Sequence, residues 1–270
     1  MITVLYEDSD VIVVEKPAGV ESQSARGFEP DMVSRIRTHI HKLSPNPSPK
    51  STNHPPYVGV IHRLDKPVSG VMVYAKTKKA AAALSKQVAD GKMQKKYLAV
   101  VCGKPVDKVD NFVDYLLKDG KTNTSRIVDK WTNGGKLAQL RFRELDSKNV
   151  EPYGGLSLLE VELLTGRHHQ IRVQMAGHGL PLWGDNKYNP AFGGEDRQRS
   201  GEGRLQAGEG RLQVGESGPQ VSKNRTGRTG RATEHVALCA FELSFFHPST
   251  GKKMTFSREP EGKIFQNFQF

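Results

Sequence analysis

Cysteine is scarce in this chain of 270 residues, which has only Cys102 and Cys239, each alone in an apolar stretch. Without a CxxC pair, the sequence excludes a disulfide framework and a cysteine-based zinc site. Apolar runs are also short, and none approaches the ~18–20 residues that span a bilayer. The first eight residues lack the basic-then-apolar order of a secretory signal. We therefore expect a protein of the reducing cytoplasm that has no membrane partner. The sequence leaves the oligomeric state open, and a monomer is the default expectation.

Negative charge is in short supply as well. Lys and Arg total 40 against 29 Asp and Glu, which gives a formal charge of +11 and a pI near 9.6. This surplus makes a polyanion such as RNA the leading class of partner. The histidine pairs His39 with His41 and His168 with His169 lack the spacing of a zinc-binding helix and any nearby carboxylate or thiol. We expect no metal.

The order of the predicted elements favours an α+β fold with a mixed, largely antiparallel sheet, because strands joined by hairpins outnumber helices and no βαβ repeat is present. Helical spacing of apolar residues predicts helices over 31–43, 78–89 and 168–176. The region 104–156 is predicted to alternate short strands with polar turns. Further strands are predicted at 2–6, 11–15, 57–61, 71–75, 95–101, 156–164, 237–246 and 253–257.

The segment 190–233 differs from the rest of the chain. It is rich in Gly, Arg, Glu and Gln, and the sequence GEGRLQ at 201–206 recurs at 208–213. The seven-residue period is that of a coiled coil, but two glycines and one leucine in each repeat give no apolar seam. We therefore predict a disordered insertion within a single domain that spans 1–270 and has no separate N-terminal RNA-binding module.

An apolar strand leads into the cluster His62-Arg63-Leu64-Asp65, which Lys66 follows. Positive neighbours keep an Asp ionised even when it is partly buried, and such a carboxylate can act as a nucleophile or a base. The alternative is an Asp that only caps a turn through its own backbone.

Two further segments carry groups suited to RNA. Arg167 and the histidines after it stand where a helix is predicted to begin, which is a favourable place for phosphate or carboxylate, although a solvated basic helix start would look the same. In the segment 93–101, Lys95 and Lys96 can meet phosphates, and Tyr97 can stack on a base or simply pack in the core.

Together these segments resemble the RluA-type family of RNA pseudouridine synthases. The first family signature, HRLD followed by two variable residues and TSG, matches residues 62–70, with Val68 in place of Thr. The second, TGRxHQIR, matches residues 165–172, and the stretch PxxGDxxY that follows it matches 181–188. The resemblance runs from Ile2 to about Phe265 and is interrupted by the insertion.

The resemblance implies the pseudouridine synthase fold, with a catalytic cleft across the sheet, and the isomerisation of a flipped-out uridine in RNA without a cofactor. It makes Asp65 the essential carboxylate and Arg172 its ion-pair partner, which is expected to lower the pKa of Asp65. It places Tyr97 against the uracil, where it can assist removal of the C5 proton. It also gives substrate contacts to Arg63, which fills the space left by the base, and to His62 and Arg167.

Some alternatives remain open from the sequence. Ribosomal RNA is favoured over tRNA as the substrate, and Asp185 is expected to be structural because Gly184-Asp185 is typical of a turn. A catalytically silent RNA-binding or ribosome-assembly protein would show the same charge. A hydrolase that uses Asp65 as a glycosidase carboxylate would need a second acid, and neither signature contains one.

Overall fold

The computed structural model describes residues 2–24, 29–43, 55–192 and 235–269. Its helices are α1 (Met32–Leu43), α2 (Lys78–Ala89) and α3 (Gln170–Gly177), with a 3-10 turn η2 (Phe265–Asn267). Its strands are β1 (Thr3–Glu7), β2 (Val11–Lys16), β3 (Gly59–Val60), β4 (Ser69–Ala75), β5 (Gln94–Cys102), β6 (Val109–Asp119), β7 (Thr124–Val128), β8 (Lys136–Val150), β9 (Gly154–Leu163), β10 (Leu238–Phe246) and β11 (Lys253–Ser257).

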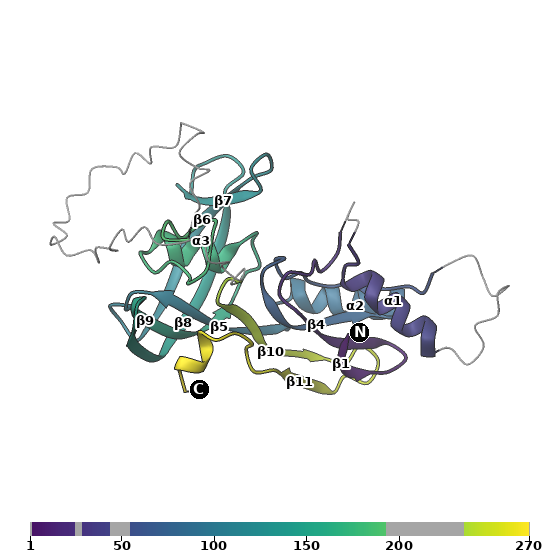
Figure 1. The fold of residues 1–270 in the computed structure, drawn as a ribbon. Helices are drawn as coiled ribbons and strands as arrows, with labels where there is room; N and C mark the ends of the chain where they lie inside the picture. The colour runs from purple at the N-terminus through teal and green to yellow at the C-terminus, as the bar shows by residue number, and fades with distance from the viewer. Residues whose placement is uncertain (1, 25–28, 44–54, 193–234, 270) are drawn as a thin grey trace.

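All eleven strands belong to one sheet, in the order β1-β2-β4-β10-β5-β9-β8-β6-β7, with β3 beside β4 and β11 beside β10. Strand β10 pairs with β4 in parallel, and the other pairings are antiparallel. The predicted α+β class with a mixed, largely antiparallel sheet is therefore confirmed. Because β10 lies between β4 and β5, a strand from the C-terminal part of the chain joins the two halves of the sheet (Figure 1).

The helices cover both faces of the sheet. The largest core cluster packs α1 and α3 on one face, through residues such as Ile36 and Met175, and it includes Tyr97 of β5. On the opposite face, Leu84 of α2 packs on β2 and β4, and Phe265 of η2 packs on β5 and β9. No helix in the described part of the chain is long and apolar enough to cross a membrane.

Helix α2 has the predicted bounds because local signals define both of its ends. The Thr77 side chain accepts a hydrogen bond of 3.1 Å from the Ala80 backbone N–H, which caps the first turn. At the other end Gly91 adopts a left-handed φ of 67°, as expected just beyond a helix. Local capping residues are therefore sufficient to define both ends of α2.

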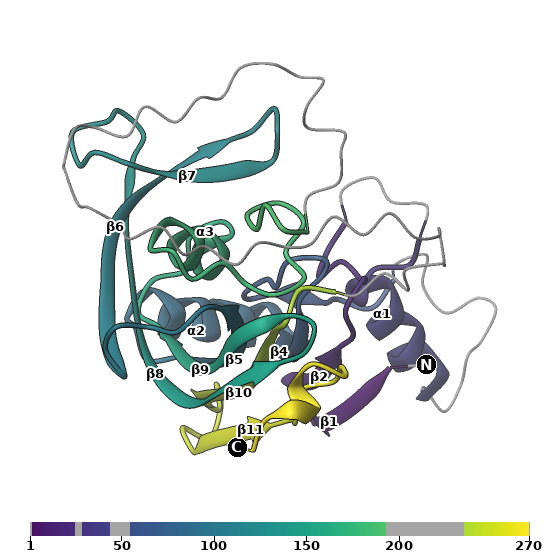
Figure 2. The ribbon, with the colours of Figure 1, turned by 60° about the vertical axis from the view of Figure 1, so that its left-hand side comes forward.

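Other predicted elements were wrong in extent. The region 104–156 holds long strands, since β6 has 11 residues and β8 has 15. The strand predicted at 57–61 shrinks to Gly59–Val60, and the third helix begins at Gln170. The predicted insertion lies outside the described residues from 193 onward. Figure 2 shows the hairpin of β6 and β7, called here the β6–β7 hairpin, extending past α3 at the end of the sheet.

Candidate active site

The loop between β3 and β4 carries Asp65, and segments near the N-terminus hold this loop in place. The Ser22 hydroxyl donates to the Leu64 carbonyl at 2.8 Å and accepts from the Leu64 N–H at 3.0 Å. The ammonium group of Lys16 donates to the Lys66 carbonyl at 3.2 Å. The backbone on both sides of Asp65 is therefore fixed, so the position of its carboxylate is set before any substrate binds.

The guanidinium of Arg172, on α3, bridges two carboxylates. Its Nη1 lies 3.4 Å from Asp65 Oδ2, so the structure contains the predicted ion pair. The stronger partner is Asp185, which accepts from Nε and Nη2 of Arg172 at 2.7 Å each. Both Arg172 and Asp185 are buried, whereas the Asp65 side chain retains 26% of its accessible surface. Asp185 thus fixes the orientation in which Arg172 presents Nη1 to Asp65.

Arg172 lowers the pKa of Asp65 as expected, but the expected net lowering was wrong because burial outweighs it. Burial raises the pKa of Asp65, and the attraction of Arg172 and Lys16 only opposes this rise. The negative charge of Asp185 adds to the rise, because a nearby like charge disfavours the ionised form of Asp65. Asp65 is therefore a carboxylate that takes up a proton more readily than a free aspartate does.

Tyr97 lies on the same face of the sheet as the Asp65 loop and is only 5% exposed. Burial raises the pKa of its phenol, and the negative charge of Asp65 raises it further. Tyr97 consequently stays protonated near neutral pH, which suits a packing surface or a hydrogen-bond donor rather than a phenolate base.

His169 stands directly before α3 with a left-handed φ of 54° and faces Asp65. Its Nε2 lies 3.7 Å from Asp65 Oδ2, and its Nδ1 lies 2.7 Å from the Tyr188 hydroxyl. Burial and the charge of Arg172 lower the pKa of His169 to about 3, so its ring is neutral at physiological pH. The Arg172 guanidinium lies over the Tyr188 ring, 5.1 Å from its centroid.

His62 and Arg167, which were both predicted to contact the substrate, differ in their exposure and partners. Nε2 of His62 accepts from the Val73 N–H at 3.4 Å, and its Nδ1 is buried without a partner among the described residues. Burial lowers the pKa of His62 to about 3. His62 is therefore uncharged near neutral pH, and its buried Nδ1 does not reach a phosphate. Arg167 is exposed, and its Nε donates to the Leu137 carbonyl at 2.8 Å.

The adjacent lysines at the start of β5 have different surroundings. Lys96 Nζ lies 3.3 Å from Glu242 Oε1. Lys95 is on the same side of β5 as Tyr97, and within the described residues no carboxylate lies at ion-pair distance from it. A Cβ on Gly166 would lie 3.7 Å from Lys95 Nζ, so the ammonium sits against the turn that precedes α3. Of these two lysines, Lys95 is the one without a carboxylate partner among the described residues, and burial lowers its pKa.

Further positive charges gather around His168. Burial, and then the nearby charges of Lys118, Lys187, Arg172 and Arg63, together lower the pKa of His168 to about 4. Arg63 follows His62 in the Asp65 loop and is exposed. Cations from β6, α3, the Asp65 loop and the segment after α3 thus lie near His168, which stacks on His169, and such a group of positive charges suits a polyanionic substrate.

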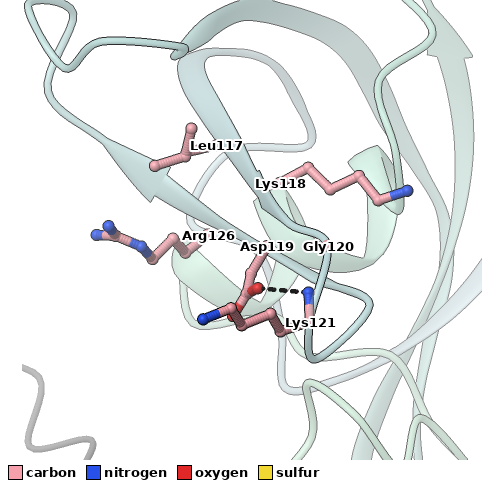
Figure 3. A pocket seen from close by; sticks show the side chains of 6 residues that line it. All are labelled: Leu117, Lys118, Asp119, Gly120, Lys121 and Arg126. Atoms are coloured by element: carbon pink, nitrogen blue, oxygen red, sulfur yellow. Dashed lines mark hydrogen bonds between the residues drawn. The ribbon is translucent and has the colours of Figure 1, made fainter.

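The β6–β7 hairpin carries a shallow groove of about 470 Å³ (Figure 3). Figure 3 shows Arg126 and Lys121 extending to one side of the hairpin and Lys118 to the other. None of the residues predicted to be catalytic lines it. The lining residues are Leu117, Lys118, Asp119, Gly120, Lys121 and Arg126.

Sequence reasoning did not assign a role in the site to Asp185 or Tyr188. Both belong to the stretch PxxGDxxY, whose place after the second signature was the available signal. The structural role expected of Asp185 fits its contacts, since it accepts from the N–H groups of Lys187 and Tyr188 in the turn, but its pairing with Arg172 was not foreseen. In the described residues, no group of three or more His, Cys, Asp or Glu side chains is placed to hold a metal ion.

Comparison with known proteins places these residues in a family. The model of the family described as RNA pseudouridylate synthase matches residues 10–177. The ribosomal large subunit pseudouridine synthase D of Zymomonas mobilis is 30% identical over 258 residues, which are 95% of this chain and 68% of that protein. The uncharacterized RNA pseudouridine synthase YlyB of Bacillus subtilis is 36% identical over 189 residues, 69% of this chain and 57% of that protein.

A solved structure supports the fold independently. The structure titled Human RNA Pseudouridylate Synthase Domain Containing 4 superposes with a TM-score of 0.67 over 98% of this chain and 90% of that chain. Its sequence identity is 20%, so this likeness concerns the fold alone.

Proposed function

The chain belongs to the RluA-type family of RNA pseudouridine synthases, and from this we propose that it converts uridines of ribosomal RNA to pseudouridine with Asp65 as the essential carboxylate. The observation that carries the proposal is the partly exposed carboxylate of Asp65, 3.4 Å from the buried guanidinium of Arg172, with further cations near the neighbouring His168. Ribosomal RNA is favoured over tRNA because the Zymomonas mobilis relative is named for the large ribosomal subunit.

The proposed reaction breaks the bond between N1 of uracil and C1′ of ribose, turns the base, and forms a bond between C5 and C1′. The proton lost from C5 is balanced by the proton gained at N1, so no oxidant, reductant or cofactor is needed. Asp65 serves this reaction either by attacking C1′ or by removing a proton from C2′. Both roles use its ionised form.

The other residues of the site orient the base and the carboxylate. We place Arg172 as the group that holds Asp65, and Asp185 as the group that holds Arg172. Tyr97 is placed against the uracil, where its protonated phenol acts by packing and by donating a hydrogen bond. The target nucleotide must leave its stack to reach this site, at a cost of a few kcal/mol. The exposed side chain of Arg63 suits the space that the base leaves.

The proposal is tested in cells that lack the protein and are supplied with the wild type or with Asp65→Asn. Pseudouridines are mapped in ribosomal RNA and in tRNA. Specific ribosomal sites should be modified with the wild type and unmodified with Asp65→Asn. Ribosomal sites that stay unmodified with both the wild type and Asp65→Asn would instead indicate a catalytically silent RNA-binding protein. Release of free uracil from RNA by the purified protein would indicate a hydrolase.

A further inference from the structure

His168 joins the helix of the active site to the β6–β7 hairpin. Its Nδ1 lies 2.8 Å from the Ser125 hydroxyl, and its Nε2 lies 3.1 Å from Asn123 Oδ1. Ser125 belongs to β7, and Asn123 lies in the turn before it with a left-handed φ of 51°. His168 occupies the variable position of the signature TGRxHQIR, so the motif itself does not explain this residue.

The directions of these hydrogen bonds follow from the chemistry of the partners. Burial and the cations around it lower the pKa of His168 to about 4, so at neutral pH the ring carries a single N–H. The Asn123 oxygen can only accept, which places this proton on Nε2. Nδ1 must then accept from the Ser125 hydroxyl. Both ring nitrogens are used, one as donor and one as acceptor.

A second route connects the same hairpin to the catalytic carboxylate. The Ser125 N–H donates to the Tyr188 hydroxyl at 2.8 Å, and that hydroxyl lies 2.7 Å from Nδ1 of His169. When Tyr188 donates to Nδ1, the proton of the neutral His169 ring is on Nε2, which faces Asp65 at 3.7 Å. His168 also stacks on His169 with ring centroids 3.7 Å apart. Ser125 is therefore connected to the Asp65 carboxylate through the side chains of Tyr188 and His169.

The hairpin has the charge to hold RNA. Its groove is lined by Lys118, Lys121 and Arg126, and Figure 3 shows these side chains extending from both sides of the hairpin. A phosphate backbone bound there would be held in a position that depends on how the hairpin sits against α3. The contacts of His168 fix that position.

We infer that His168 is a positioning residue that fixes the β6–β7 hairpin relative to Asp65, so that RNA bound by the hairpin presents its uridine to the carboxylate. This inference rests on the proposed function. It assigns His168 no contact with the reacting atoms, and its effect is to be found in the rate of the bound complex rather than in RNA affinity.

The test measures single-turnover pseudouridine formation at saturating RNA, and RNA affinity separately. His168→Phe keeps the stacking on His169 and removes both hydrogen bonds, so its rate should fall about tenfold while affinity changes less than threefold. His168→Gln retains a donor for Asn123 and should recover at least half of the loss on a logarithmic scale. Thr124→Ala is the matched control, because its hydroxyl bonds to Thr122 within the same hairpin, and its rate should stay within twofold of wild type.

Ser125→Ala completes a double-mutant cycle. Its loss should not add to that of His168→Phe, because the two substitutions break the same hydrogen bond. Unchanged rates in both single variants, or additive losses in the double variant, would overturn the inference. Lowered affinity at an unchanged rate would also overturn it. A wild type that forms no pseudouridine would refute the proposed function instead, so the two failures are distinguishable.

Discussion

Replacing Asp185 by Asn tests whether this residue, rather than Asp65, is the structural partner of Arg172. The substitution keeps the size of the side chain but removes its negative charge and one of the two oxygens that accept from the guanidinium. Arg172 is 3% exposed and Asp185 is 1% exposed, so water cannot replace the lost partner. The only carboxylate left to Arg172 among its described ion pairs would be Asp65, at the longer distance of 3.4 Å.

The expected loss of stability is large for a single atom change. Removing one partner of a buried ion pair costs about 3–5 kcal/mol. We expect the lower end, about 3 kcal/mol, because Asp65 still neutralises part of the charge and the amide oxygen can accept one hydrogen bond. For a domain of this size, about 2–4 °C of Tm is lost for each kcal/mol, which predicts a fall of about 6–12 °C.

Thermal and denaturant unfolding of the purified protein would measure this loss. Glu160→Gln is the matched control, because it breaks the pair with Arg143, whose side chain is 58% exposed. Such surface pairs contribute about 0–1 kcal/mol, so the control should unfold within about 3 °C of wild type. Equal Tm values for Asp185→Asn and Glu160→Gln would refute the role given to Asp185.

Two further outcomes follow from the site. Because burial raises the pKa of Asp65 and only its ionised form is active, the rate at saturating RNA should rise with pH through a pKa above the ~3.9 of free aspartate; a pH–rate profile with its acid limb at or below that value would contradict this. Lys95→Gln should weaken RNA binding and reduce the slope of log affinity against log salt by about 1, whereas Lys96→Gln should change little because Lys96 pairs with Glu242; equal effects in a salt titration would contradict the assignment of Lys95.

The sequence predicted best where local chemistry decides the structure. Helix α2 is bounded by Thr77 and Gly91, and its bounds were predicted correctly. The long strands β6 and β8 were not predicted. Their exposed faces carry polar residues that resemble turns, and only pairing with neighbouring strands extends them. A local sequence pattern does not predict strand pairing of this kind.

In the site, too, the sequence predicted individual residues better than the properties that depend on the tertiary structure. The family resemblance predicted roles for Asp65, Tyr97 and Arg172, and the structure brings Asp65 and Arg172 to within 3.4 Å. The sign of the pKa shift of Asp65 was wrong, because burial and a second carboxylate determine it. That carboxylate, Asp185, is 13 residues from Arg172 and could be assigned to it only through the fold.

Single-turnover conversion of ribosomal RNA by Asp65→Asn, with RNA binding measured on the same samples, tests the role of Asp65 most directly. The variant should bind RNA within a few-fold of wild type and form no pseudouridine, since an amide can neither attack C1′ nor take a proton from C2′. Pseudouridine formation at the wild-type rate by this variant would contradict the proposal that the ionised Asp65 performs the reaction.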